Sequence, residues 1–174
     1  MDLNTYIKEF KINNYKHFNE FYKETSKQIY FTALGILNDD NDASDILQDT
    51  YISFLNNIDS FKIGTNIYAY LTTIARNKSI NLYNKNKKII HNEEILGYIP
   101  DGGSSNNYIS DRRAMEIINR LLNRDEREIV IYHVLLDYKF KDIASIMNMK
   151  LSTVIWHYNK AMKYLKEGMM SDAQ

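Results

Sequence analysis

Helical periodicity governs almost the whole of this sequence. Apolar residues recur three and four positions apart in most segments, and no segment alternates apolar and polar residues as a half-buried strand does. The single proline, Pro100, leaves long stretches without a residue that breaks helices. We therefore predict an all-α fold.

The clearest helical pattern follows a stripe of apolar residues at positions 29–37. Its members keep the i, i+3, i+4, i+7 spacing of one helix face: Ala43, Ile46, Leu47, Tyr51, Phe54, Leu55 and Ile58. We expect Asp42 or Ser44 to cap this helix, because both side chains can accept hydrogen bonds from free backbone N–H groups. A further helix is predicted from about Thr65 to Asn84.

Periodicity stops in a segment that contains Pro100 and half of the six glycines. This composition is typical of a flexible linker. We predict a helical domain at residues 1–86, a linker at 87–109 and a second helical domain at 110–174. Ser110 or Asp111 is expected to cap the first helix of the second domain, and Asp125 the next one.

Composition argues against several classes of protein. The chain has no cysteine, and its four histidines are scattered without the spacing of metal ligands. No glycine-rich phosphate loop or catalytic motif occurs, so we expect neither an enzyme nor a cofactor. The start "MDLNTYIKEF" lacks a secretory signal, and the run Ile129–Leu136 is too short to span a membrane. We expect a cytoplasmic protein.

Charges are segregated although the formal net charge is zero. Residues 39–49 contain five aspartates and no lysine or arginine, whereas residues 62–92 contain five lysines and one arginine and no acidic residue. An acidic surface followed by a basic one suggests two partners of opposite charge. Two ordinary solvated helix faces would give the same pattern.

The segment "DIASIMNMKLSTVIWHYNKAMKYL" suggests a helix-turn-helix. One short apolar face (Ile143, Ala144, Ile146 and Met147) precedes a polar break at residues 148–150. After the break, a second face recurs at helical spacing: Leu151, Val154, Tyr158, Ala161 and Leu165. Ser152 or Thr153 could cap the second helix, whose polar face would enter the major groove of DNA. A plain helical hairpin with a polar outer surface is the alternative.

Two blocks of the sequence resemble RNA polymerase sigma factors of the sigma-70 family, of the extracytoplasmic-function type that retains conserved regions 2 and 4. "DASDILQDTYISFLNNIDSFKIGTNIYAYLTTIARNKSINLY" is similar to region 2, and "LNRDEREIVIYHVLLDYKFKDIASIMNMKLSTVIWHYNKAMKYLK" is similar to region 4. A helix-turn-helix alone would fit many regulators, but the "DILQD" block is far more specific.

The resemblance implies roles for residues of the first block. The acidic helix would bind the coiled coil of the largest catalytic subunit of core RNA polymerase through Asp45, Gln48, Asp49 and Ile52, supported by Phe54. The loop at residues 60–66 and the helix after it would bind and open the −10 promoter element. The residues implied for this contact are Lys62, Tyr68, Tyr70, Arg76, Asn77 and Lys78. The family commonly has tryptophan at the position of Tyr70, and Tyr70 also lies on the apolar stripe, which makes a core role at least as plausible.

In the second block the resemblance implies that the last helix reads the −35 promoter element. The matched positions are Ser152, Thr153, Ile155, Trp156, His157, Asn159 and Lys160. The family often has basic residues where this sequence has Ile155 and His157, so the resemblance does not carry over a promoter sequence.

We therefore expect an alternative sigma factor that binds core RNA polymerase and directs promoter recognition, DNA melting and transcription initiation. The resemblance also implies an anti-sigma protein as a partner, and no small-molecule substrate or membrane insertion. The alternative function is a helix-turn-helix regulator that binds DNA without being a polymerase subunit.

Overall fold

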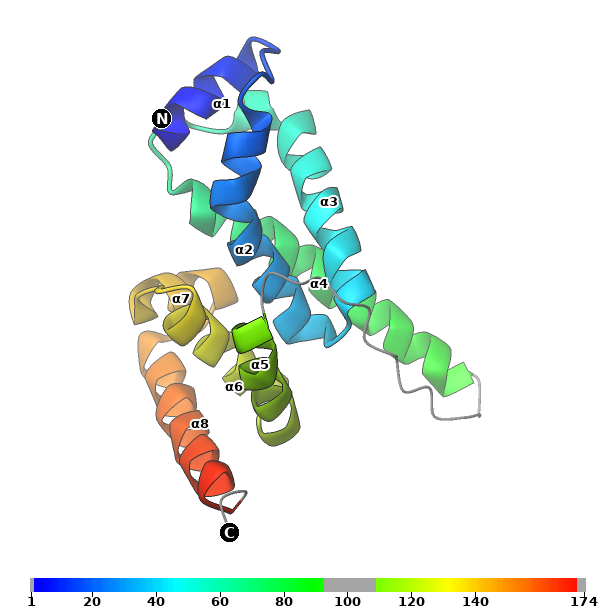
Figure 1. Ribbon diagram of the computed structural model, residues 1–174, viewed down its shortest axis with the longest axis vertical. Coiled ribbons are helices and arrows are strands. Elements are labelled where there is room, and N and C mark those ends of the chain that lie inside the picture. The colour runs from blue at the N-terminus through cyan, green and yellow to red at the C-terminus, as the bar shows by residue number, and fades with distance from the viewer. Residues whose placement is uncertain (1, 93–108, 172–174) are drawn as a thin grey trace. The chain divides into compact units, whose positions relative to one another are not determined.

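The computed structural model describes residues 2–92 and 109–171 (Figure 1). Every regular element in these two ranges is helical, as the sequence predicts, and none is a strand. The chain divides into two compact units, with helices α1–α4 in the first and α5–α8 in the second. No helix of the described residues is both long enough and apolar enough to cross a membrane.

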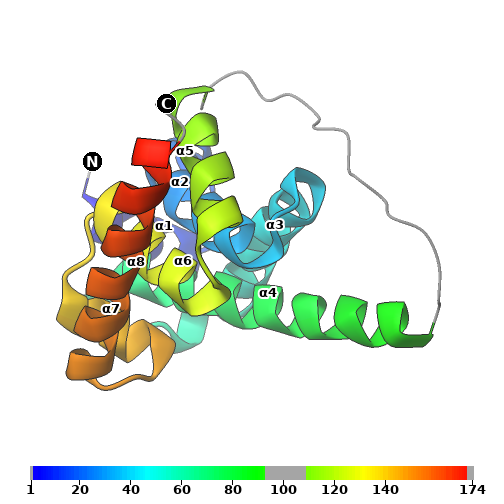
Figure 2. The ribbon, with the colours of Figure 1, turned by 90° about the horizontal axis from the view of Figure 1, so that it is seen from below.

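The first unit contains four helices. They are α1 (Leu3–Lys11), α2 (Phe18–Leu37), α3 (Asp40–Asn56) and α4 (Ile67–Asn92), with a single 3₁₀ turn at Ile58–Ser60 between α3 and α4. Figure 2 shows α4 as one continuous helix. The predicted helix at 65–84 is therefore present, but it continues through the first six residues of the expected linker. The expected linker residues 93–108 lie outside the described residues.

Aromatic rings form the centre of the first unit. Phe21 of α2 and Phe54 of α3 are completely buried, and their rings stack with centroids 5.7 Å apart. Beside them, the hydroxyls of Thr25 and Tyr51 share a buried hydrogen bond of 2.7 Å between α2 and α3. These contacts fix which face of α3 is turned inward.

The second unit contains α5 (Ile109–Leu121), α6 (Arg124–Val130), α7 (Phe140–Met147) and α8 (Leu151–Ser171). A five-residue π-helical segment, Ile131–Leu135, continues α6. Ile118, Leu122, Val130 and Ala161 form the buried centre of this unit. Tyr158 and Leu165 pack against that centre while remaining partly exposed. The structure thus confirms that one side of α8 is a packing face.

The predicted helix caps are wrong. Helix α3 begins at Asp40, so Asp42 and Ser44 lie inside its first turns, and α5 begins at Ile109, before Ser110 and Asp111. Helix α6 is capped by Asn123 and not by Asp125. Aspartate suits both the cap and the first helical turn, because its acidic group near the amino end also complements the helix dipole. Residue type alone therefore misplaces the first residue of each helix by a few positions.

Candidate functional site

One face of α3 gathers the four residues predicted to bind a protein partner. Asp45, Gln48, Asp49 and Ile52 are all exposed, at the spacing of a single helical stripe. The positions between them are buried: Ile46, Leu47, Thr50 and Tyr51. Ile52 is 57% exposed although it is a large apolar residue. The result is an acidic surface with an apolar contact point at one end, which we name the α3 face.

The α3 face touches the basic helix α4. Lys78 Nζ lies 3.9 Å from Asp49 Oδ2, and the Asp49 side chain remains 62% exposed. A pair this long and this exposed contributes at most about 1 kcal/mol to stability. Both side chains therefore remain available to other partners at little cost. Phe54, expected to support the α3 face, is fully buried in the core.

The loop between α3 and α4 is anchored at both ends. Lys11 donates a hydrogen bond of 2.9 Å to the carbonyl of Asp59, and the N–H of Gly64 donates one of 3.2 Å to Asn4 Oδ1. Gly64 has φ +92°, a conformation that L residues rarely adopt. Asn66 ends the loop and caps α4, since its Oδ1 accepts from the N–H of Ala69. The anchors hold up a short exposed stretch that includes Lys62 and Ile63.

The two tyrosines predicted to contact DNA have different surroundings. The Tyr70 ring packs edge-on against Phe61, with centroids 4.9 Å apart, and also against Phe54. Tyr70 thus packs against the aromatic core, although it remains partly exposed. Tyr68 is partly exposed, and its pKa is raised by burial and by the nearby Glu24 carboxylate. The phenol of Tyr68 stays neutral and able to stack.

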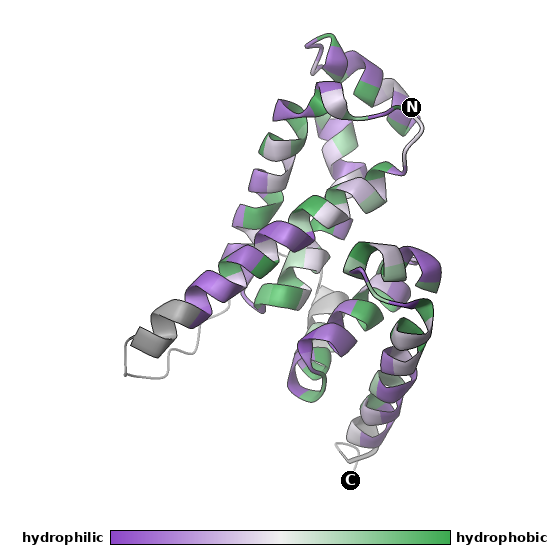
Figure 3. Cartoon of the chain, turned by 180° about the vertical axis from the view of Figure 1, so that it is seen from behind, coloured by the Kyte–Doolittle hydropathy of each residue, from purple (hydrophilic) through white to green (hydrophobic). Residues whose placement is uncertain are grey.

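The three adjacent residues of α4 that are predicted to contact DNA differ in exposure. Asn77 is exposed, whereas Arg76 and Lys78 on either side of it are partly buried. Lys62 is exposed on the loop before α4. In Figure 3, α4 carries both hydrophilic and hydrophobic residues along its length, as expected of a helix with one packed side. The structure therefore brings the predicted −10 residues onto one loop and one helix without grouping all of them on one face.

Helices α7 and α8 form the predicted helix-turn-helix. At the turn, Asn148 adopts a left-handed conformation with φ 53°, and the N–H of Met149 donates a 2.9 Å hydrogen bond to the carbonyl of Ala144. This bond closes the carboxyl end of α7 in the way that commonly ends a helix. Asparagine tolerates this conformation better than most residues other than glycine. The polar break in the sequence is thus a structured turn.

Helix α8 presents a mixed polar and apolar face to solvent. Val154 and Ala161 are completely buried on its inner side. The exposed side holds Ser152, Ile155, Trp156 and Asn159, while Thr153, His157 and Lys160 are partly buried. Leu151 was expected in the core but is 47% exposed, because it is the first residue of the helix. Because α8 already begins at Leu151, Ser152 and Thr153 lie inside its first turn and do not cap it.

Lys160 has an internal partner that sequence reasoning missed. Its Nζ lies 2.9 Å from Oε1 of Glu126, a carboxylate that is almost completely buried at the start of α6. Glu126 also forms a capping box with Asn123, in which each side chain bonds the other residue's backbone N–H. The hydrogen bond to Glu126 raises the pKa of Lys160. The spacing Asn-x-x-Glu is a recognised signal for such a box and was visible in the sequence.

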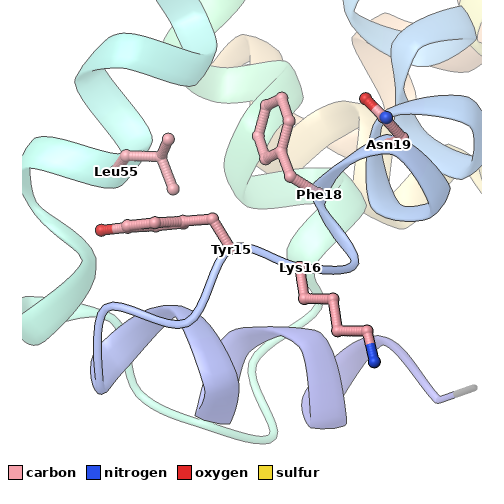
Figure 4. Close-up of a pocket in the computed structure, with 5 residues that line it drawn as sticks. All are labelled: Tyr15, Lys16, Phe18, Asn19 and Leu55. Atoms are coloured by element: carbon pink, nitrogen blue, oxygen red, sulfur yellow. The ribbon is translucent and has the colours of Figure 1, made fainter.

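A shallow pocket in the first unit was also not predicted (Figure 4). It has a volume of about 400 Å³ and is lined by Tyr15, Lys16, Phe18, Asn19 and Leu55. Tyr15 and Lys16 lie in the connection between α1 and α2, Phe18 and Asn19 begin α2, and Leu55 lies near the end of α3.

No group of three or more His, Asp or Glu side chains that could hold a metal occurs within the described ranges.

The described residues form two helical units, one with an exposed acidic helix face and the other with a helix-turn-helix, an arrangement typical of two-domain DNA-binding transcription proteins. Sigma-70 region 2 matches residues 21–89, and Sigma-70 region 4 matches residues 113–165. The chain belongs to the sigma-70 family of RNA polymerase sigma factors, and it is a sigma factor of the extracytoplasmic-function kind. Members of this family bind core RNA polymerase and promoter DNA, and they are not enzymes.

Two relatives have similar sequences. The ECF RNA polymerase sigma factor EcfG of Rhodopseudomonas palustris (strain TIE-1) is 27% identical over 134 residues, which cover 74% of this chain and 72% of the relative. The RNA polymerase sigma factor YlaC of Bacillus subtilis (strain 168) is 27% identical over 135 residues, which cover 73% and 77%. These matches favour a polymerase subunit over a regulator that acts without polymerase.

Two solved structures share the fold. The sigma factor RpoE from Bartonella quintana, solved in complex with the anti-sigma factor NepR, is 21% identical with a TM-score of 0.74 and covers 90% of this chain and 99% of that one. CnrH, solved in complex with the cytosolic domain of CnrY, is 15% identical with a TM-score of 0.71 and covers 97% of each chain.

Proposed function

We propose that the α3 face is the surface through which this sigma factor binds core RNA polymerase. The observation that carries the proposal is the joint exposure of Asp45, Gln48, Asp49 and Ile52 on one side of α3, while Ile46, Leu47, Thr50 and Tyr51 are buried. An acidic surface suits a basic partner, and the exposed Ile52 gives an apolar contact that a purely solvated face would not need.

We further propose that the anchored loop and the start of α4 contact the −10 element. Lys62 supports this role because it is an exposed cation on a loop held in place from both sides. Tyr68 is the better candidate for stacking on an unpaired base, since the Tyr70 ring already packs against Phe61 and Phe54. Arg76, Asn77 and Lys78 would then contact phosphates further along α4.

The exposed side of α8 is the proposed contact with the −35 element. Two weakly binding units gain affinity together when polymerase fixes their separation. This arrangement explains how a chain with no net charge can select promoters, because polymerase supplies part of the nonspecific attraction to DNA.

An anti-sigma protein is the proposed regulatory partner. RpoE, which has the same fold, was solved in complex with the anti-sigma factor NepR. Such a partner would control the sigma factor by competing with polymerase or promoter DNA for these surfaces.

The test of the α3 face is capture of core RNA polymerase by the tagged full chain. We expect the double variant Asp45→Lys, Asp49→Lys to lower the affinity at least tenfold, equivalent to about 1.4 kcal/mol. Glu20→Lys, an exposed charge reversal on α2 of the same unit, is the matched control and should bind normally. Equal capture of the double variant and the control would contradict the assignment.

A further inference from the structure

The amino-terminal half of α8 offers DNA an unusual set of side chains. From Leu151 to Asn159 the helix contains no aspartate, glutamate, lysine or arginine. The first cation is Lys160, and its Nζ is already paired with Glu126. A helix-turn-helix contacts bases mainly through this half of its second helix. This half of α8 would therefore meet base edges with uncharged groups: hydroxyl, amide, aliphatic and indole.

Two large apolar residues stand in the middle of that surface. Ser152, Ile155, Trp156 and Asn159 share one side of α8, and Trp156 is 58% exposed while Ile155 is 37% exposed. Neither belongs to the buried core, since the inner side of the helix is formed by Val154 and Ala161. Exposed apolar side chains at a recognition surface indicate an apolar feature on the partner.

The Trp156 ring is held in place through a chain of contacts. Lys160 Nζ lies 5.3 Å from the centre of the Trp156 ring and 5.5 Å from that of Tyr164, within the range of a cation–π interaction. Glu126 fixes Lys160 by its ion pair, and Asn123 fixes Glu126 through the capping box. The ammonium group thus links the start of α6 to the indole on the exposed side of α8.

We propose that α8 selects A·T base pairs by packing Trp156 and Ile155 against the methyl groups of thymine, and that Lys160 positions Trp156 instead of contacting a base. The inference rests on the proposed −35 contact of α8. The thymine methyl is the apolar feature of the major groove, and Asn159 has the amide that pairs with adenine N6 and N7. The usual reader of guanine is an arginine or lysine, and the groove-facing part of this helix has neither free.

Uracil in place of thymine tests the proposal, because the two bases differ only by the methyl group. Polymerase holoenzyme reconstituted with the full chain is used to select from duplexes randomised upstream of a fixed −10 element. Thymine positions that become enriched are then replaced one at a time by deoxyuridine, and the affinity is measured again. Loss of one buried methyl group should weaken binding about fourfold at one or two positions.

Variants separate the two roles. Trp156→Ala should remove the difference between thymine and uracil. Lys160→Met should make the affinity difference between thymine and uracil smaller than in the wild type. Lys160→Arg should retain the wild-type difference, because arginine keeps both the ion pair and the cation–π contact. Lys163→Ala is the matched control, an exposed lysine on the same helix. This control should leave the difference in affinity between thymine and uracil duplexes unchanged.

The outcomes separate the thymine proposal from the −35 contact on which it rests. Enrichment of upstream sequences without any penalty for uracil, or enrichment of guanine at the positions read by α8, would overturn the thymine proposal and leave the −35 contact intact. Absence of any enrichment upstream would refute the −35 contact itself, and the thymine proposal with it.

Discussion

Lys78 Nζ lies 3.9 Å from Asp49 Oδ2, so the surface proposed for polymerase and the helix proposed for the −10 element meet at one ion pair. The two side chains have opposite expected partners although they touch. A protein partner that takes up Asp49 would release Lys78 for a phosphate at little energetic cost, because the exposed pair is weak.

The first prediction separates the two halves of this pair. Lys78→Ala should leave capture of core polymerase unchanged and should make the dependence of promoter binding on salt less steep by about one in the log–log slope. Asp49→Asn should instead weaken polymerase capture. The measurement is promoter affinity of the holoenzyme across a salt series, with Lys23→Ala, an exposed lysine on α2, as the control. A loss of polymerase binding in Lys78→Ala would argue against separate roles.

The second prediction concerns adjacent residues of α8 with opposite burial. Val154 is fully buried, so Val154→Asp should cost on the order of 4 kcal/mol or more and unfold the second unit. Ile155→Asp places the same charge on the exposed side and should retain the helicity of the wild type while weakening promoter binding. Circular dichroism during thermal unfolding measures the helicity of both variants, and the promoter affinity of the holoenzyme measures the loss expected for Ile155→Asp. Full helicity in Val154→Asp would refute the buried face of α8.

The third prediction tests the cap of α6. Asn123→Ala removes the oxygen that accepts from the N–H of Glu126 and should cost about 1 kcal/mol. For a unit of this size the unfolding temperature should fall by roughly 4–8 °C. Asn123→Ser, which retains a capping oxygen, should recover most of the loss. An unchanged melting temperature in Asn123→Ala would show that the capping box contributes little.

The fourth prediction follows from the raised pKa of Lys160. A raised pKa means that the folded state favours the protonated lysine, so this stabilisation is fully present below the unfolded value of 10.5 and is lost as the pH rises through the folded pKa. The difference in melting temperature between the wild type and Lys160→Met should therefore be constant from about pH 6 to 9 and should shrink above about pH 10.5. Lys163→Met serves as the control for general alkaline effects. A difference that shrinks already near neutral pH would contradict the ion pair.

The sequence predicted the helices and the exposure of the α3 face well because both depend on local spacing. Buried Ile46, Leu47 and Tyr51 alternate with exposed Asp45, Gln48 and Asp49 at helical intervals, and such a pattern requires no knowledge of the partner helices. Helix ends were predicted poorly, since the same residue types serve as caps and as first-turn residues. The position of Tyr70 was left open for a related reason: an aromatic residue at an apolar position suits both a core and a stacking role.

The role of Lys160 could not be predicted from periodicity. Its place on the polar side of α8 suggested a DNA contact, but its partner Glu126 is on another helix and far away in sequence. Only tertiary packing brings the two together. Trp156 was correctly expected on the exposed side, whereas the contact that orients its ring depends on the same packing.

The separation of the two sides of α8 has a practical consequence for engineering. Ser152, Ile155, Trp156 and Asn159 could be exchanged as a set without touching Val154 or Ala161, so the helix can serve as a cassette for changing promoter choice. Libraries built at these four positions, with Asn123, Glu126 and Lys160 left intact, would let one scaffold drive transcription from many unrelated synthetic promoters.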